Sequence, residues 1–221
     1  MNIQKQILIL LVLIVYKSWP CDLENKLKEY GLVNLKDKDS LIEVEIINAT
    51  TNNLLGINSY GCLNKCYLRP EAVNKLEQAQ KELDKIVKGY RLKVLEGTRP
   101  RSVQKKMYDV VKNKGIKKFV ADPNKGSMHN FGTAVDITIV DKYGKEIDMG
   151  KPDPRIKIIN KSEIEIKLLL LLNRVSEKQN QNRKLLKTVM LKSGFIPVSY
   201  EWWHFDAFPK EYVRTHFKII E

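Results

Sequence analysis

The sequence has few of the residues that mark specialised protein classes. Three cysteines among 221 residues are too few for a disulfide-stabilised miniprotein. Only 11 glycines and 8 prolines occur, which excludes a collagen-like chain, and 43% hydrophobic residues exclude a disordered one. The apolar run at residues 7–16 is too short to span a bilayer, and the composition excludes a multi-span membrane protein. An ordinary globular chain remains, long enough to bury a full core in one domain.

Acidic residues are scarce relative to basic ones, 26 against 39, which gives a net charge of +13. This charge is compatible with a polyanionic partner such as nucleic acid, anionic lipid or a cell-wall polymer. However, 31 of the 39 basic residues are lysines scattered along the chain, and no basic segment is interleaved with stacking aromatics. With the abundant Asn and Ile, this pattern indicates an AT-biased coding background, and we expect no nucleic-acid binding.

The first 21 residues have the pattern of a signal peptide. Lys5 and the terminal amine form a basic start, the apolar run of residues 7–16 follows, and no acidic residue precedes Asp22. The cleavage signal is poor, because no pair of small residues follows the run. We expect an exported, periplasmic protein; membrane association through this segment and a cytoplasmic location are the alternatives.

The three cysteines allow more than one arrangement in an exported protein. Cys21 stands where a lipoprotein cysteine could be, although Trp19 and Pro20 precede it in place of small residues. Cys62 and Cys66 are close together in a loop, so they can form a bridge or remain two free thiols. The sequence leaves these alternatives open.

Residues 22–221 are expected to form one domain of the α+β class, with a small, mainly antiparallel sheet flanked by helices. Helical periodicity predicts helices at 70–88, 102–112, 163–175 and 181–193, of which the first begins at Pro70 and the second is capped by Ser102. Strands are predicted at 41–47, 92–95, 133–141 and, as a bent strand or strand pair, 195–205.

Only three histidines occur, and the first lies beside a strand with a polar open face. His129 is in the loop before the strand at 133–141, and Gly132 allows the backbone to turn between them. The odd-numbered residues at 135–139 form an apolar face, so Asp136 points to the opposite face. A histidine that enters a strand and an aspartate on its open face can converge on one point.

The second histidine belongs to the sequence Glu201-Trp202-Trp203-His204. A spacing of three residues places Glu201 and His204 on opposite faces of a regular strand, so their convergence requires a bulge or kink. Trp202, Trp203 and Phe205 would form a dry wall around the charges. Either motif alone fits a structural histidine better, but together they contain the ligands of a catalytic zinc site with an open position. His216 has no acidic neighbour and is expected at the surface.

An arginine lies in a rigid turn, Glu96-Gly97-Thr98-Arg99-Pro100, directly after a predicted strand. A turn of this kind can aim Arg99 at an anion or a developing oxyanion. Alternatively, Arg99 is a structural residue that pairs with Glu96 or a loop carbonyl. The local sequence does not decide between the two.

Taken together, these motifs resemble a known family. The pattern Ser127-x-His129-x-x-Gly132-x-Ala134-x-Asp136, followed by Glu201-x-Trp203-His204, is similar to the zinc D-alanyl-D-alanine dipeptidases of the VanX type. These enzymes belong to the D,D-peptidase family with the Hedgehog-like fold. The similarity covers roughly residues 42–206 and also includes Gly97-x-Arg99-Pro100, Met149-Gly150 and the segment from Asn182-Arg183 to Ser193-Gly194-Phe195.

The resemblance implies a role for each of these residues. One Zn²⁺ per chain would be held in a cleft on the sheet by three ligands, His129, Asp136 and His204. Glu201 would be the general base, and Arg99 would stabilise the tetrahedral intermediate. Ser127 would lie near the C-terminal carboxylate of the substrate, and Asp153 would hold its free amine.

Two features depart from the family pattern. Asp153 is one residue closer to Met149-Gly150 than expected, so it could instead shape the turn between two prolines. Asn48 stands where the family usually has a tyrosine that lines the pocket, and Leu54 replaces an expected phenylalanine. The substrate range could therefore differ from that of the family.

The function implied is hydrolysis of the dipeptide D-Ala-D-Ala in peptidoglycan metabolism, with Glu201 assisting the attack of water on the peptide carbonyl. One alternative is a D,D-carboxypeptidase or endopeptidase that acts on peptidoglycan stem peptides. Asp153 discriminates, because a carboxypeptidase must leave the amine end of the site open. A non-catalytic zinc-containing module that binds the cell wall is an alternative of a different class, and Glu201 and Arg99 argue against it.

Overall fold

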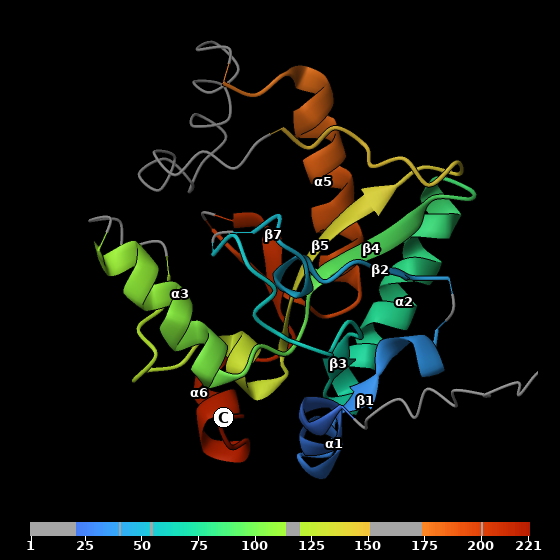
Figure 1. Ribbon diagram of the computed structural model, residues 1–221. Helices are drawn as coiled ribbons and strands as arrows, with labels where there is room; N and C mark the ends of the chain where they lie inside the picture. Colours follow the sequence, from blue (N-terminus) through green and yellow to red (C-terminus); the bar gives the residue numbers. More distant parts are fainter. Residues whose placement is uncertain (1–20, 40, 54, 114–119, 151–173, 200) are drawn as a thin grey trace, which may run out of the picture.

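A five-stranded sheet runs through the middle of the computed structural model, which describes residues 21–221 except 40, 54, 114–119, 151–173 and 200 (Figure 1). In spatial order its strands are β2 (Glu43–Val44), β4 (Arg91–Glu96), β5 (Ala134–Val140), β7 (Glu201–Asp206) and β6 (Ile196–Val198). Only the pair formed by β2 and β4 is parallel; the other neighbours are antiparallel. The predicted α+β domain with a small, mainly antiparallel sheet is confirmed.

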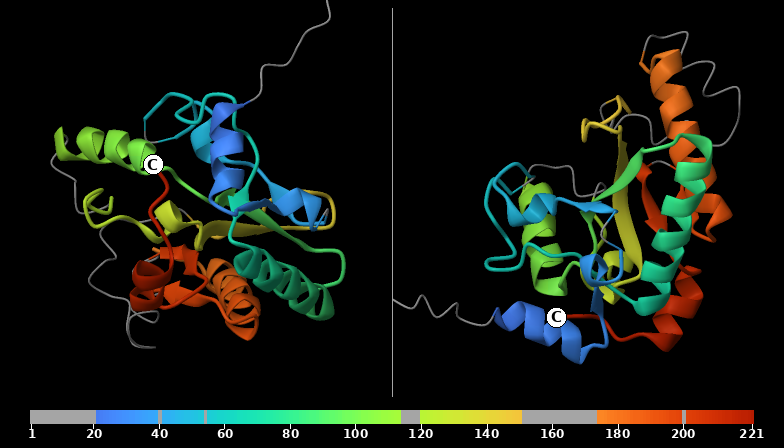
Figure 2. Two further views of the ribbon diagram at one scale, coloured as in Figure 1. Left: turned by 90° about the horizontal axis from the view of Figure 1, so that it is seen from below. Right: turned by 90° about the vertical axis from the view of Figure 1, so that its right-hand side faces the viewer.

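Two long helices, α2 (Pro70–Ile86) and α5 (Glu177–Lys192), cover one face of the sheet (Figure 2). Their apolar sides pack against the odd-numbered residues of β5, whose side chains at 135, 137 and 139 are fully buried. The opposite face of the sheet is left to the segment 47–63 and to α3 (Arg101–Asn113). Polar side chains of the central strands can therefore face a cavity on that side.

Short elements complete the fold around the ends of the sheet. They are α1 (Asp22–Glu29), β1 (Val33–Asn34), η1 (Leu35–Asp37), η2 (Ile47–Ala49), β3 (Tyr67–Leu68), η4 (Met128–Phe131) and α6 (Lys210–His216). β1 and β3 form a separate antiparallel pair. Within the described part of the chain, no helix is long and apolar enough to cross a membrane.

The predicted helix starts at 102 and 181 were both wrong. α3 begins at Arg101, because the carbonyl of Pro100 already accepts the first helical hydrogen bonds, so Ser102 is not its cap. α5 begins four residues earlier than predicted, because the hydroxyl of Ser176 caps it by accepting a hydrogen bond from the backbone of Gln179. The helix predicted at 163–175 falls almost entirely outside the described residues.

The N-terminal part of the domain also differs from the prediction. The strand predicted at 41–47 is reduced to two residues in β2, and α1 was not predicted at all. α1 has only eight residues, which is too short for a stable isolated helix. It is held by tertiary packing, since Leu27 is fully buried in the core.

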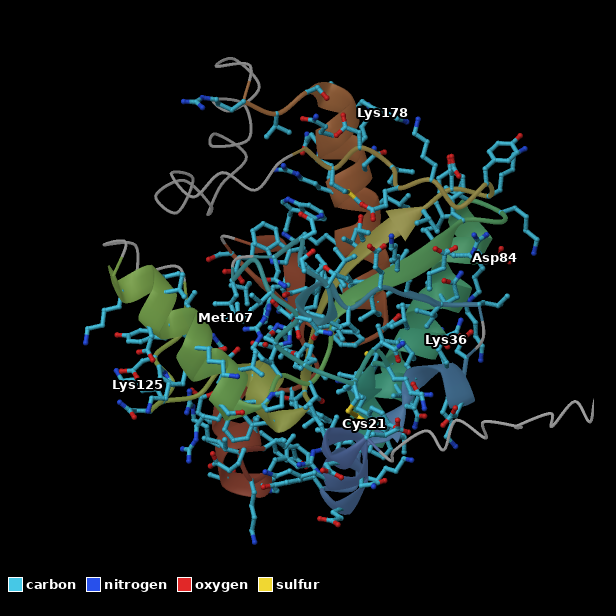
Figure 3. All side chains as sticks on the ribbon, in the orientation of Figure 1. Cys21, Lys36, Asp84, Met107, Lys125 and Lys178 are labelled. Atoms are coloured by element: carbon cyan, nitrogen blue, oxygen red, sulfur yellow. A yellow bond between two sulfur atoms is a disulfide. The ribbon has the colours of Figure 1, made fainter. Side chains whose placement is uncertain are left out.

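The cysteines form a pair that the sequence did not suggest. Cys21, at the start of α1, is joined to Cys62, and Cys66 is a free, buried thiol (Figure 3). Both the Cys62–Cys66 bridge and a free thiol at Cys62 are therefore wrong. The partners are 41 residues apart, and it is the docking of α1 that brings them together. Burial raises the pKa of the Cys66 thiol well above its usual range.

Candidate metal and active site

A row of three polar side chains, Glu96, Asp136 and His204, crosses three neighbouring strands of the sheet. In the ladder, Glu96 of β4 is paired with Asp136 of β5, and Asp136 is paired with His204 of β7. Residues directly opposite each other in a sheet share one face and are near neighbours. The register therefore brings the aspartate of the first motif against the histidine of the second, 68 residues further along the chain.

The irregularity predicted between Glu201 and His204 is present in β7. Val198 of β6 is paired with Glu201 and Pro197 with Phe205, so the register shifts between these two pairs. As a result, Glu201 Oε2 lies 3.9 Å from His204 Nδ1. A regular strand would have pointed these side chains to opposite faces, and the predicted kink is confirmed.

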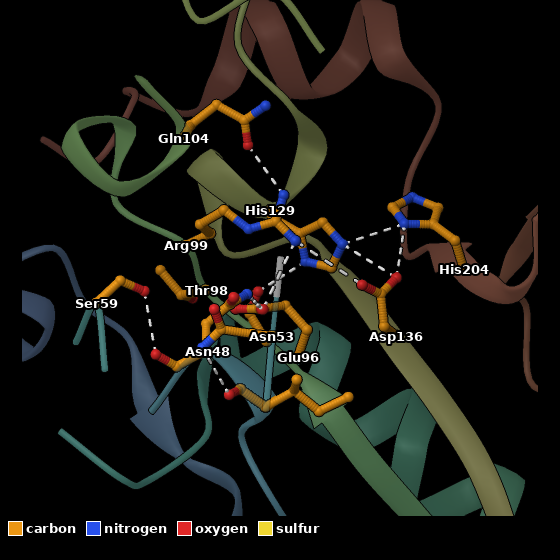
Figure 4. Close-up of polar contacts among 12 residues, drawn as sticks. Asn48, Asn53, Ser59, Glu96, Thr98, Arg99, Gln104, His129, Asp136 and His204 are labelled. Atoms are coloured by element: carbon orange, nitrogen blue, oxygen red, sulfur yellow. Dashed lines mark hydrogen bonds and ion pairs between the residues drawn. The ribbon is translucent and has the colours of Figure 1, made fainter. Parts of the chain in front are cut away.

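His129 reaches the row from η4, the turn that precedes β5. Gly132 ends this turn with a φ of +73°, and a Cβ there would lie 2.7 Å from a side-chain carbon of Leu32, so the turn requires glycine. His129 Nδ1 donates a hydrogen bond to the carbonyl oxygen of Gly97 at 2.7 Å. This bond fixes the ring with Nε2 directed toward Asp136 and His204 (Figure 4).

Three donor atoms, His129 Nε2, Asp136 Oδ1 and His204 Nδ1, converge at this point. The two nitrogens are 3.1 Å apart, and they lie 3.3 Å (His129) and 3.0 Å (His204) from the carboxylate oxygen. Ligands bound to a tetrahedral zinc at about 2.0–2.2 Å are themselves about 3.3–3.6 Å apart. The three atoms are close to this spacing, so the group could hold a zinc ion.

The outer hydrogen bonds show which nitrogens of the two rings carry protons on the side away from the cluster. A carbonyl oxygen faces His129 Nδ1, and a carboxylate oxygen of Asp206 lies 2.9 Å from His204 Nε2. Both oxygens only accept hydrogen bonds, so these nitrogens carry the protons of the neutral rings. The inner nitrogens and the carboxylate oxygen, about 3 Å apart, can share a positive charge, either a proton on His204 or a metal ion, and this donor set suits a metal.

The electrostatics of the group agree with this conclusion. Burial lowers the pKa of His204, but its contacts with Asp136 and Asp206 outweigh burial and raise the pKa to about 10. Burial raises the pKa of Asp136, but the two histidines outweigh it and hold the pKa well below its usual range. Without a metal, His204 therefore carries a second proton at neutral pH, which a bound metal ion would displace.

Arg99 lies beside this group. Its Nη2 is 3.6 Å from Glu96 Oε2 and 3.8 Å from Asp136 Oδ2, and its Nη1 donates to Gln104 Oε1 at 2.9 Å. Both interpretations of the turn are partly realised, since Arg99 pairs with Glu96 and also lies beside the metal-binding group. Its Nε is buried with no hydrogen-bond partner among the described residues, so a donor remains for a bound oxygen.

A backbone hydrogen bond and a side-chain hydrogen bond join the Arg99 turn to the His129 turn. Arg99 N donates to the carbonyl of His129 at 3.0 Å, and Asn130 Nδ2 donates to the carbonyl of Arg99 at 2.7 Å. The C-terminal tail bridges the same region, because Ile220 N donates to Asn130 O and Ile220 O accepts from Arg101 N, both at 2.8 Å. The two turns are therefore held as one unit.

A family model agrees with this geometry. The model for Peptidase_M15, described as D-ala-D-ala dipeptidase, matches residues 28–221, which contain every residue of the site. The chain belongs to this family. The resemblance seen in the sequence motifs is thereby confirmed.

Curated relatives of this M15 peptidase carry the same description. The D-alanyl-D-alanine dipeptidase of Escherichia coli (strain K12) is 27% identical over 165 residues, which cover 75% of this chain and 78% of the relative. That of Synechocystis sp. is 27% identical over 63% of this chain and 68% of its own. That of Enterococcus faecium is 29% identical over 41% of this chain and 42% of its own.

Among solved structures, that of the LD-carboxypeptidase LdcB is similar, with a TM-score of 0.43 and 24% sequence identity. The match covers 67% of this chain and 63% of the LdcB chain, which is less than two thirds of its length.

Two cavities of the M15 peptidase meet at the row. The first has a volume of about 290 Å³ and is lined by Ser127, His129, Glu201 and His204, among others. The second has a volume of about 700 Å³ and includes both tryptophans and residues 146–150 in its wall. Arg99, Met107, Asp136 and Trp203 line both cavities, and Met107 points from α3 toward the middle of the molecule (Figure 3).

The remaining predicted residues can now be placed. Ser127 lies in the wall of the first cavity beside His129. Of the predicted aromatic wall, Trp202 and Trp203 line a cavity, whereas Phe205 is buried in the core and lines neither. His216 is exposed and stacks on Tyr212, as expected for a surface residue. Asp153 and Leu54 lie outside the described residues.

Three buried residues around the site, Tyr60, Gln104 and Asp206, were missed by the sequence analysis. Glu96 accepts hydrogen bonds from Tyr60 and from Asn48, the residue that departs from the family pattern, and Asn48 also lines the second cavity. Gln104 and Tyr60 gave no local signal, because both reach the site through long-range packing. Asp206 did give one, since it stands two residues after His204 and therefore on the same face of β7.

Proposed function

We propose that this M15 peptidase is a zinc-dependent D-alanyl-D-alanine dipeptidase that acts in peptidoglycan metabolism. The observation that carries the proposal is the convergence of three donor atoms in the wall of the cavity that also holds Glu201 and Arg99. Membership of the M15 family and the dipeptidase relatives support the choice of substrate.

One zinc ion would be held by His129, Asp136 and His204, which leaves a position open for water or substrate. When bound, the ion would polarise the peptide carbonyl and lower the pKa of a water molecule. The histidines and the aspartate contribute by fixing its place against the cavity wall.

Glu201 is suited to proton transfer. Its side chain is 26% exposed, so a water molecule in the cavity can reach it, and it lies 3.9 Å from a metal-binding nitrogen. We propose that Glu201 accepts the proton of the attacking water and then delivers it to the amine of the departing D-alanine.

Arg99 is suited to stabilise negative charge on the former carbonyl oxygen. Its guanidinium lies where the two cavities meet, and Gln104 and Glu96 hold it in place. A preoriented, buried donor of this kind stabilises an oxyanion more than it stabilises the neutral carbonyl. Trp202 and Trp203 would exclude bulk water from the same region.

The two ends of the dipeptide would be recognised by different residues. We propose that Ser127 lies near the C-terminal carboxylate and that Asp153 pairs with the free ammonium group. Truncating one partner of a shielded charge pair typically costs about 2–5 kcal/mol. The enzyme should therefore prefer free D-Ala-D-Ala strongly over its N-acetylated form.

The test is the kcat/KM for both substrates in the wild type and in Asp153→Asn. The variant should lose at least about tenfold on the free dipeptide and change little on the acetylated one. Asp109→Asn, which removes an exposed carboxylate on α3, serves as the charge-matched control. If the wild type cleaves both substrates equally well, or if Asp153→Asn loses activity equally on both, a carboxypeptidase function replaces the dipeptidase proposal.

We further propose that residues 1–21 direct export of the protein to the periplasm. The Cys21–Cys62 disulfide supports this, because such bonds persist in oxidising compartments. A reporter fused after residue 40 should be active outside the cytoplasm. Strictly cytosolic reporter activity would contradict the proposal.

A further inference from the structure

Asp206 is the one carboxylate at the histidine cluster that the proposed mechanism leaves without a task. It is the last residue of β7 and is only 3% exposed. Its Oδ1 lies 2.9 Å from His204 Nε2, which is its one side-chain hydrogen bond among the described residues. Asp206 and Asp136 therefore contact opposite edges of the same imidazole.

The two histidines of the cluster are held in different ways. His129 presents Nε2 to the cluster and is fixed through Nδ1 by the backbone carbonyl of Gly97. His204 presents Nδ1 and is fixed through Nε2 by the carboxylate of Asp206. A carboxylate accepts a stronger hydrogen bond than a carbonyl does, and it places negative charge behind the ring.

The cost of burying Asp206 also points to a function. A buried carboxylate is unfavourable unless it is paired, and Asp206 could be replaced by an apolar residue at this position in the sheet if packing alone mattered. The pairing puts its charge where it bears on one nitrogen of His204.

We propose that Asp206 is a positioning residue that fixes the tautomer and ring orientation of His204 and strengthens Nδ1 as a metal ligand. Carboxylates that accept a hydrogen bond from a metal-binding histidine typically change metal affinity by about 10- to 100-fold. The inference rests on the proposed zinc centre. In this role Asp206 acts through His204 and not directly on the substrate or the metal.

Zinc affinity of the metal-free protein, measured by competition with a chelator, tests this directly. Asp206→Asn keeps the shape of the side chain but removes its charge, and should weaken zinc binding by about 10- to 100-fold. Asp206→Ala also removes the acceptor and should weaken it at least as much. Glu211→Gln, which removes an exposed carboxylate in the first turn of α6, should leave the affinity unchanged.

A second readout separates positioning from a general loss of structure. The visible absorption of the cobalt-substituted protein should shift in Asp206→Asn, while its circular dichroism and melting temperature stay close to those of the wild type. If Asp206→Ala does not fold, Asp206→Asn alone decides. Wild-type zinc affinity together with an unchanged cobalt spectrum in Asp206→Asn would overturn the inference.

The same measurements distinguish this failure from failure of the proposed function. A wild-type protein that binds zinc and hydrolyses D-Ala-D-Ala, with an Asp206→Asn variant of equal zinc affinity, contradicts only the positioning role. A wild-type protein that binds no zinc contradicts both proposals.

Discussion

The strand-built half of the site and its turn-built half are held in place by different means. Asp136, His204 and Glu201 lie on strands, where the ladder fixes them and the bulge in β7 turns Glu201 toward the others. His129 and Arg99 lie on turns, which are fixed by a few individual hydrogen bonds, one between their backbones and one from the His129 ring to the carbonyl of Gly97. In the proposed mechanism, the strands thus provide two of the three metal ligands and the base, and the turns provide the third ligand and the guanidinium.

The largest effect on turnover should come from the strand half. Glu201→Gln retains the size of the side chain but cannot accept a proton, so kcat for D-Ala-D-Ala should fall by about 10²–10⁴. Zinc content and melting temperature should not change, because Glu201 is not among the three converging ligands. Wild-type turnover in Glu201→Gln would remove the residue from the mechanism.

The turn half should give a smaller loss that is specific to the transition state. Arg99→Lys keeps the positive charge but loses the planar guanidinium that reaches both Gln104 and the row. We expect kcat to fall by about 10²–10³ with a smaller change in KM. An effect on KM alone would reassign Arg99 to binding of the ground-state substrate.

The pH dependence of zinc binding should report His204. Its pKa of about 10 in the metal-free protein means that zinc displaces a proton at every pH below that value. Zinc affinity should therefore rise by about tenfold per pH unit between pH 6.5 and 8.5, and His216→Ala should not alter this slope. A flat profile of zinc affinity against pH would contradict the raised pKa.

The same pKa shift affects the stability of the metal-free protein. Protonation of His204 stabilises the metal-free protein below pH 6.5, and this stabilisation is lost as pH rises toward 10.

The smallest effect expected is on the stability of the turn half. Gly132→Ala forces a left-handed conformation on alanine and drives its Cβ toward Leu32, and should cost about 1–3 kcal/mol of unfolding free energy. Gly56→Ala is the matched control, because Gly56 has a φ of +69° with nothing within 4 Å of a Cβ. Its cost should be smaller, since it measures backbone strain alone. Equal costs in urea denaturation would show that the close approach at Gly132 is not limiting.

The strand half was also the more predictable from sequence. Alternation in β5 placed Asp136 on the open face, and the three-residue spacing of Glu201 and His204 required the kink that is present. Both rules depend only on local strand geometry. The pairing of Asp136 with His204 could not be predicted, because strand order depends on contacts between distant segments.

The turn half depended on contacts that leave no local pattern. Nothing in the sequence linked Gln104 to Arg99, because the contact exists only when α3 packs at the end of β4. The Cys21–Cys62 disulfide was missed for the same reason, since α1 had not been predicted. Asp206, which lies in the strand-built half, was also missed, although its two-residue spacing from His204 could have revealed it.

The most direct test of the central claim is zinc content measured together with hydrolysis of D-Ala-D-Ala. The purified wild type should contain about one zinc per chain, lose activity on chelation and regain it when zinc is added back. A His129→Ala, His204→Ala double variant should contain almost none and be inactive. Full activity in the metal-stripped wild type, or full zinc content in the double variant, would contradict the claim that His129, Asp136 and His204 form the catalytic metal centre.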